Sequence, residues 1–533
     1  MPLVAVVTSL ALAACSDSLV VSPTGSTTNS PEISAPGATA TTVTTSTATA
    51  STATTTSVTP AQPTPAQPVE SETQRIDWVE LEPGIEEASF GVPIDHDDPD
   101  GEQIELYLVR HLAADPSARI GTLFVNPGGP GFGASDLALQ ADFIYGAALL
   151  DAFDIIGIDP RGTGRSGPTV DCVDDYDPYF SIETGPDDAT EDAALQAIAS
   201  DFAQRCIERS GDVFAHITTV ASATDVDLVR QALGEETVSW FGWSYGTELG
   251  ATWATLFPET VRAAVLDGAV DPTVGRVDEL VQQAAGFDSA LTAFLADCSA
   301  DTSCAFHNGG DAEGAFLDLL VAVETTRIPT LDGRPPLNQG IFETGVIEAM
   351  YDDSSWPSLA EALTDAADGD GAAMIGLNDR YYGRRSDGSY GDELEAYFAI
   401  VCADDPAAPA PAGAAVDEAV AVRRDFYLTA PRISTAIAYE VLICASLAAA
   451  GSGGGTPLDV TGEGAGPIVV VGNTGDPATP FEGSRRMADT LDDAIFVAVE
   501  ANRHTAYGLN ACIDRTIDEF LVDLELPDRG LTC

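Results

Sequence analysis

Apolar residues follow strand-like patterns at intervals along most of the chain, and helical patterns separate them. Alternating runs at residues 88–93 and 104–111 predict a hairpin. Continuous apolar runs, which are typical of buried strands, occur at 121–126, 153–158, 237–241, 263–268, 468–472 and 495–499. Helical spacing occurs at 191–210, 222–233, 247–257 and 482–491. Strands that alternate with helices predict an α/β fold with a mostly parallel sheet covered on both faces.

The strand pattern stops between about residues 271 and 457. Acidic, alanine-rich segments with helical spacing replace it, for example 277–298, 312–326 and 356–367. We therefore predict one α/β core in two parts, residues 76–272 and 458–533, with an inserted, mainly helical lid at residues 273–457 between them. An insertion at this point would lie over the carboxyl ends of the strands.

Residues 1–15 are small and apolar, too few to span a bilayer, and they end in Leu12-Ala13-Ala14-Cys15. This pattern indicates an export signal and resembles a bacterial lipobox, in which Cys15 becomes a lipid-bearing N-terminus. The basic residues that usually precede such a run are absent, so whether Met1 is the true start stays open. The segment predicts a lipoprotein held on the outer face of the membrane, or a secreted protein.

Residues 16–75 are rich in Thr, Ser, Ala and Pro and have almost no large apolar side chains. Such a segment cannot bury enough surface to offset its conformational entropy. We therefore expect a disordered tether between the signal and the folded part. Its Thr, Ser and Pro content permits O-glycosylation without demonstrating it.

The charge of the chain is strongly negative, with 23 basic against 84 acidic side chains and a formal net charge of −61. Nucleic acid is therefore not an expected partner, because a polyanion would be repelled. Every basic residue is Arg, which excludes a P-loop lysine, a Schiff-base lysine and a Ser-Lys dyad. The acidity fits either a solvated surface suited to a salty exterior or the steering of cationic substrates.

Nine cysteines are present, and Cys15 stands apart from the other eight. An even set in an exported protein suggests four disulfides, and sequential pairing is the simplest arrangement although sequence cannot fix it. The predicted pairs are Cys172–Cys206, Cys298–Cys304, Cys402–Cys444 and Cys512–Cys533. No Cys-x-x-Cys pair exists and no histidine has zinc-finger spacing, so no metal site is predicted.

A Gly-x-Ser-x-Gly sequence, Gly242-Trp243-Ser244-Tyr245-Gly246, lies between a predicted strand and a predicted helix. This order describes a nucleophile elbow, in which small neighbours let a strained turn expose one hydroxyl. The motif also recurs by chance in long glycine-rich chains, so its position between strand and helix carries the argument. Ser244 is the predicted nucleophile.

In the elbow architecture the acid and the base follow the serine, each after a late strand. Of the five histidines only His504 follows both the elbow and the resumed sheet, which makes it the predicted base. Asp476 comes directly after the strand predicted at 468–472 and is the predicted acid, although an Asp before Pro also forms turns. Asp267, at the end of an earlier strand, is the fallback.

The strand predicted at 121–126 leads into a glycine-rich segment, residues 127–133. The segment is either an ordinary flexible loop or a loop that directs backbone N–H groups at a developing oxyanion. On the second interpretation Gly129 and the residue after the nucleophile, Tyr245, donate to the oxyanion. A lone Gly-x-Gly at 162–164 lacks the remainder of a phosphate-binding pattern, and we discount it.

Several separate motifs point to one family. They are Asn126-Pro127-Gly128-Gly129-Pro130-Gly131, Asp159-Pro160-Arg161-Gly162, Gly242 to Thr247, Leu266-Asp267-Gly268, Asp476-Pro477 with Thr479-Pro480, and His504. With them the chain from about residue 76 resembles the tripeptidyl-aminopeptidase-like α/β-hydrolases, relatives of proline iminopeptidase. One departure is that Arg503 and Thr505 flank the histidine, where that family commonly has a glycine. The resemblance implies an α/β-hydrolase fold and a secreted or envelope-bound serine hydrolase that acts as an aminopeptidase, esterase or endopeptidase.

The leading prediction is an envelope-anchored serine aminopeptidase that releases short peptides, tripeptides by the resemblance, from free N-termini. A carboxylesterase with the same triad and a more apolar lid pocket is the alternative. A non-catalytic binding lipoprotein would account for the signal, tether and disulfides but not for the triad. A peptide's ammonium needs carboxylates near Ser244, and Asp404 and Asp405 beside Cys402 are the first candidates unless they are only surface acids. No cofactor is required, and the oligomeric state cannot be read from the sequence.

Overall fold

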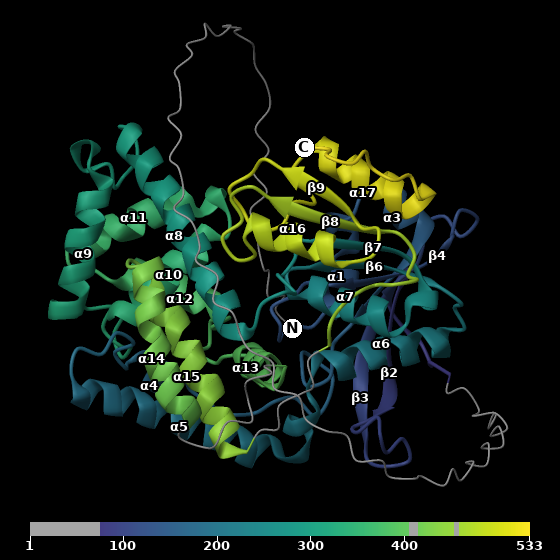
Figure 1. Ribbon diagram of the computed structural model, residues 1–533, viewed down its shortest axis with the longest axis horizontal. Coiled ribbons are helices and arrows are strands. Elements are labelled where there is room, and N and C mark those ends of the chain that lie inside the picture. Colours follow the sequence, from purple (N-terminus) through teal and green to yellow (C-terminus); the bar gives the residue numbers. More distant parts are fainter. Residues whose placement is uncertain (1–74, 405–413, 452–457) are drawn as a thin grey trace, which may run out of the picture. The chain divides into compact units, whose positions relative to one another are not determined.

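The computed structural model describes residues 75–404, 414–451 and 458–533. The predicted signal with Cys15 and the predicted tether up to residue 74 lie outside the described residues. A nine-stranded sheet in the order β1-β2-β3-β5-β4-β6-β7-β8-β9 forms the core (Figure 1). The strands are β1 (Val79–Glu82), β2 (Ile85–Pro93), β3 (Gln103–His111), β4 (Gly121–Asn126), β5 (Phe153–Ile158), β6 (Val238–Trp243), β7 (Val261–Asp267), β8 (Ile468–Asn473) and β9 (Ile495–Val499).

The sheet is antiparallel at one end and parallel over the rest. Strands β1, β2 and β3 form a meander, and β3 pairs antiparallel with β5. From β5 to β9 all neighbours are parallel. The carboxyl ends of these parallel strands share one edge, which is where an α/β sheet places its functional residues.

Strand residues alternate between two hydrophobic layers, which explains the continuous apolar runs. In β4, Leu123 and Val125 face a layer that includes residues of α3 and α17, whereas Phe124 faces a layer with α6 and α7. Every residue of β4 and of β5 is buried. A parallel sheet covered on both faces requires this pattern, because neither face meets water.

The core helices lie against these two faces of the sheet. They are α1 (Ser135–Leu139), α2 (Ala141–Ile144), α3 (Ala147–Ala152), α6 (Thr219–Leu233), α7 (Tyr245–Leu256), α16 (Phe481–Thr490) and α17 (Ala511–Asp523). Short 3₁₀ helices occur at η1 (Gly211–His216), η2 (Pro258–Thr260), η3 (Asn308–Gly310) and η4 (Asp353–Ser355).

None of the described helices is both long and apolar enough to cross a lipid bilayer.

The described residues between β7 and β8 contain helices and no named strand, as the lid prediction requires (Figure 1). These helices are α8 (Arg276–Ala300), α9 (Ala312–Thr326), α10 (Gln339–Met350), α11 (Trp356–Ala367), α12 (Ala372–Tyr381), α13 (Glu393–Ala403), α14 (Ala414–Thr429) and α15 (Ser434–Ala450).

The lid also includes a segment that precedes the elbow, which the predicted boundary at residue 272 did not separate from the core. Helix α5 (Ala189–Ser210) packs against α15. Helix α4 (Asp177–Phe180) directly precedes α5 in the same stretch of chain. Buried Glu395 of α13 accepts hydrogen bonds from the backbone N–H of Cys172 at 2.6 Å and of Val173 at 2.9 Å. The lid, defined from here on as α4, α5 and α8–α15, is thus built from two stretches of chain.

The eight described cysteines form disulfides in sequential order: Cys172–Cys206, Cys298–Cys304, Cys402–Cys444 and Cys512–Cys533. The third joins α13 to α15 inside the lid. The fourth holds the C-terminal segment beside β9, where the N–H of Cys533 donates to the carbonyl of Ala498 at 2.9 Å. This contact covers the outer edge of a strand that would otherwise present unpaired backbone groups.

Candidate active site

Ser244 lies at a sharp turn between β6 and α7. Its φ of 53° and ψ of −125° are rarely adopted by a residue with a side chain, and such strain is characteristic of functional turns. The flanking glycines are sterically required, since a Cβ on Gly242 would lie 2.1 Å from the carbonyl oxygen of Gly246. The N–H of Ser244 donates to the carbonyl of Asp267 at 3.0 Å, which fixes the turn to the adjacent strand.

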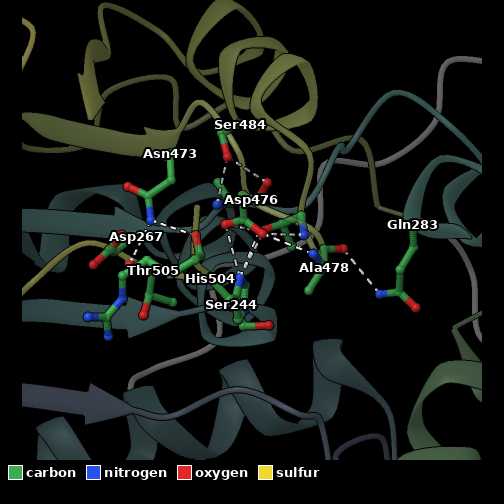
Figure 2. A network of polar contacts seen from close by, with 12 residues as sticks. Ser244, Asp267, Gln283, Asn473, Asp476, Ala478, Ser484, His504 and Thr505 are labelled. Atoms are coloured by element: carbon green, nitrogen blue, oxygen red, sulfur yellow. Dashed lines mark hydrogen bonds and ion pairs between the residues drawn. The ribbon is translucent and has the colours of Figure 1, made fainter. Parts of the chain in front are cut away.

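His504 and Asp476 meet at the carboxyl edge of the sheet. Nδ1 of His504 lies 3.0 Å from each oxygen of the Asp476 carboxylate (Figure 2). Asp476 is buried and also accepts hydrogen bonds from the backbone N–H of Ala478 at 3.0 Å and of Thr479 at 2.9 Å. A carboxylate held in this way fixes the orientation and the tautomer of the ring.

Nε2 of His504 lies on the opposite side of the imidazole ring from Asp476. Among the described residues no group shares a hydrogen bond with it, although the atom is buried. His504 and Ser244 line the same cavity, and a Cβ on Gly268 would lie 3.1 Å from Cε1 of the ring. Between these two described side chains there is no direct hydrogen bond.

Charge around the imidazole favours its protonated form. Burial is the largest influence on the pKa of His504 and lowers it, as does Arg503. The charge and hydrogen bond of Asp476, with a contribution from Asp267, outweigh both, so the pKa of His504 is raised above its ordinary value. The ring is thereby prepared to accept a proton.

Asp267, the fallback acid, has its hydrogen-bond partners among the described residues in the backbone and not in the ring of His504. Its buried carboxylate accepts hydrogen bonds from the backbone N–H groups of Ala506 and Tyr507, each at 2.9 Å. Burial raises the pKa of Asp267 to about 6. Thr505 has a φ of 62°, unfavourable for a β-branched residue, and these hydrogen bonds hold the loop in that conformation. Asp267 therefore anchors the histidine loop.

The glycine-rich loop approaches Ser244 closely. A Cβ on Gly128 would lie 2.8 Å from Cβ of Ser244, and the N–H of Gly128 is already bonded to Oδ1 of Asn126 at 2.9 Å. Gly129, with a φ of 106°, and Tyr245 both line the cavity beside Ser244. The N–H of Tyr245 belongs to the first turn of α7 and has no intrahelical acceptor. Both residues that carry the predicted oxyanion donors therefore line the same cavity as Ser244.

A cavity of about 450 Å³ lies between the core and the lid, with Ser244 and His504 in its wall. Aromatic side chains, most of them from the lid, cover much of the remaining wall: Phe180, Phe287, Tyr351, Tyr381, Tyr382, Tyr397, Phe398 and Tyr439. The volume suits a small molecule or a few amino-acid residues.

Comparison with known proteins assigns the family. The model of the alpha/beta hydrolase fold matches residues 121–308, and that of the TAP-like proteins matches residues 430–533. Serine protease Hip1 of Mycobacterium tuberculosis is 32% identical over 466 residues, which cover 83% of this chain and 86% of the relative. The chain belongs to the TAP-like α/β hydrolases.

Two further relatives of this TAP-like hydrolase have different names. Carboxylesterase B of Mycobacterium tuberculosis is 33% identical over 84% of this chain and 86% of its own length. Tripeptidyl aminopeptidase of Streptomyces lividans is 30% identical over 87% of this chain and 86% of its own length. The chain is therefore a serine hydrolase, either a peptidase or an esterase.

One of the two predicted ammonium ligands of this TAP-like hydrolase, Asp404, does not line the cavity. The carboxylate of Asp404 accepts hydrogen bonds from the N–H of Thr219 at 3.1 Å and from its Oγ1 at 2.6 Å. Asp404 is not among the residues that line the cavity, because the end of α13 directs it to the start of α6. Asp405 lies outside the described residues.

Five glutamates line the cavity: Glu248, Glu279, Glu348, Glu393 and Glu440. Three of them surround Arg276, and we call these three the acidic wall: Glu248 of α7, Glu279 of α8 and Glu440 of α15. Arg276 lies among them, with Nη1 3.2 Å from Glu279 and Nη2 3.1 Å from Glu440. Glu248 has no ion pair among the described residues. Burial, reinforced by the charges of Glu279 and Asp404, raises the pKa of Glu248 to about 8. One guanidinium thus faces three carboxylates.

One member of the acidic wall had a sequence signal that was overlooked. Glu248 is four residues after Ser244, so it lies one helical turn beyond the nucleophile and on the same side of α7. Glu279 and Glu440 had no comparable signal, because the folding of the lid brings them to the site from distant parts of the chain.

Proposed function

We propose that this TAP-like hydrolase is an exported serine aminopeptidase that releases short peptides, tripeptides by its family, from free N-termini. The observation that carries the proposal is the acidic wall, which gathers three carboxyl groups around one guanidinium in the same cavity as Ser244. An ester substrate needs no such charge, whereas a peptide's α-ammonium does.

The proposed reaction begins when Oγ of Ser244 attacks the carbonyl carbon while Nε2 of His504 takes its proton. Asp476 holds the ring and stabilises the imidazolium. The N–H groups of Gly129 and Tyr245 receive the oxyanion, and losing one such donor typically costs about 100- to 1000-fold in rate. The imidazolium then gives its proton to the leaving amine, and water releases the acyl group by the same steps in reverse order.

Recognition of the amino terminus follows from the charge balance of the acidic wall. Arg276 offsets part of the charge of Glu279 and Glu440, and Glu248 is the member of the acidic wall that has no ion pair among the described residues. Glu248 is therefore the proposed ligand for the ammonium. A bound ammonium would favour the ionised form of Glu248, which in the free enzyme takes up a proton below a pH of about 8. The distance between this wall and Ser244 then limits the length of the released peptide.

Turnover of three matched substrates tests the proposal. We expect rapid hydrolysis of a tripeptide anilide, at least about 100-fold slower hydrolysis of its N-acetylated twin because the ammonium is lost, and slow hydrolysis of a short acyl nitrophenyl ester. Release of the intact tripeptide would be confirmed by mass spectrometry. Equal rates for the free and acetylated peptides would rule out recognition of the amino terminus.

A carboxylesterase is the second candidate, favoured by the aromatic lining of the cavity and by the name of one relative. An apolar acyl chain would pack against the tyrosines and phenylalanines of the lid with the same triad in use. In the three-substrate assay an esterase would turn over the nitrophenyl ester fastest and treat both peptides alike.

We also propose that Cys15 carries a lipid and that residues 16–75 tether the enzyme to the outer face of the membrane. The proposal rests on the sequence of residues 1–15, which resembles a lipobox. Mass spectrometry of the mature protein is expected to find a lipid-modified Cys15 at its N-terminus. An unmodified N-terminus further along the chain would refute the anchor.

A further inference from the structure

The lid makes direct contact with the loop that carries His504. The backbone N–H of His504 donates to the carbonyl of Tyr351 at 2.8 Å, and the next lid residue, Asp352, forms an antiparallel bridge with Arg503. The ring of Tyr351 packs edge-on against the imidazole with centroids 5.7 Å apart. The main-chain partner of the proposed base therefore comes from the lid, immediately after α10.

An ion pair joins the same two segments. Nη2 of Arg503 lies 3.3 Å from Oδ2 of Asp352, and the two side chains are 28% and 33% exposed. Arg503 precedes His504 in the chain, and its charge opposes protonation of the imidazole. Asp352 neutralises this charge from the lid side. The pair therefore links the position of the lid to the electrostatic potential at the base.

The acid loop has a similar support from the lid. Nε2 of Gln283 in α8 donates to the carbonyl of Ala478, two residues after Asp476, at 3.1 Å (Figure 2). Gly286 lies against the same loop, since a Cβ there would be 2.3 Å from the carbonyl oxygen of Pro477. Both loops that complete the proposed triad thus rest on lid residues.

We propose that Tyr351 and Asp352 are positioning residues for the catalytic base: they fix the main chain of His504 and, through Arg503, set the potential at its ring. This inference rests on the proposed function, because it requires His504 to act as the base. A lid that moved away would remove both the acceptor for the His504 N–H and the partner of Arg503. The base is therefore fully competent only beneath a closed lid.

Several charged or titratable groups face the imidazole or the ion pair from the packed elements. The core contributes Asp476 and Asp267, the histidine loop contributes Arg503, and the lid contributes Tyr351, Asp352 and Asp353. Removal of the Arg503 charge and removal of the Asp352 charge must act on the ring in opposite directions.

The test measures the pH dependence of kcat/KM for a short acyl nitrophenyl ester, which makes no use of Glu248, with the variants Asp352→Asn and Arg503→Gln. We expect the acidic limb to move to lower pH in Asp352→Asn, because Arg503 is no longer neutralised, and to higher pH in Arg503→Gln. Each shift should be roughly 0.2 to 0.7 pH units, as for partly exposed pairs. The double variant should return close to the parent profile, and kcat should fall about two- to fivefold in each single variant with KM within about twofold.

Asp192→Asn is the matched control, because it removes the partner of Arg423 in a lid ion pair with side-chain exposures of 29% and 20%. It should leave the pH profile unchanged. Shifts in the same direction, or no shifts, would overturn the proposal, since a merely structural bridge is broken equally by either substitution. Fluorophosphonate labelling of Ser244 in every variant separates this outcome from failure of the proposed function, in which the parent enzyme itself would not be labelled.

Discussion

Replacement of His504 by alanine is expected to reduce kcat for a tripeptide anilide by about 10⁶-fold, with little change in KM. The reason is that Nε2 of His504, on the opposite side of the ring from Asp476, is buried and has no hydrogen-bond partner in the part of the chain that the structure describes, so it is the proposed acceptor of the serine proton. Without it the Ser244 hydroxyl keeps its proton and is a poor nucleophile. Steady-state kinetics, with product followed over hours for the variant, measure the effect.

His307→Ala is the control for this variant. His307 lies in the lid after the Cys298–Cys304 disulfide, with Nδ1 3.0 Å from the carbonyl of Cys298, and it does not line the cavity. We expect its kcat to stay within about twofold of the parent value, as for a substitution remote from the chemistry. If His504→Ala retained more than about a hundredth of the parent kcat, His504 could not be the base.

Replacement of Glu248 by glutamine is expected to lower kcat/KM for free-amine peptides by on the order of 10- to 100-fold and to leave N-acetylated peptides and esters unaffected. Glutamine keeps the size of the side chain and removes the charge that an ammonium would pair with. The burial-raised pKa of about 8 adds a second signature. In the parent enzyme KM for the free peptide should fall as pH rises from 6 to 8, whereas in Glu248→Gln this dependence should disappear.

Glu313→Gln is the matched control, because Glu313 is a lid carboxylate with a 63% exposed side chain that is not among the cavity residues. It should behave as the parent with every substrate. Equal losses on free and acetylated peptides in Glu248→Gln would show that Glu248 maintains the shape of the cavity and does not select the amino terminus.

The parallel sheet could be predicted from the sequence almost residue for residue. The runs at 121–126, 153–158 and 495–499 coincide with β4, β5 and β9. Strands buried on both faces are continuous apolar segments, and such a signal is local. The place of α5 was not predictable in this way, because an amphipathic helix shows which face it buries but not the element that covers it.

The candidate site likewise has a part that local sequence motifs predict and a part that depends on the packing of distant segments. That Ser244, His504 and Asp476 come together could be predicted, because the elbow motif fixes the chain order of the three residues and the chain has few histidines to choose from. The prediction for Asp404 depends on the neighbouring disulfide, which does join α13 to α15. A rigid backbone does not determine where a side chain points, however. The carboxylate of Asp404 accepts a hydrogen bond from Thr219 and does not line the cavity. Apart from Glu248, one helical turn after Ser244, the acidic wall depends on the packing of α8 and α15 against α7, which brings Glu279 and Glu440 from distant parts of the chain.

The identity of the acylated residue tests the central claim most directly. The purified parent enzyme and its Ser244→Ala variant would be treated with a fluorophosphonate, and the modified peptide would be found by digestion and mass spectrometry. We predict one adduct per chain, on Ser244, and none in the variant. An adduct on another residue, or undiminished labelling of Ser244→Ala, would contradict the account.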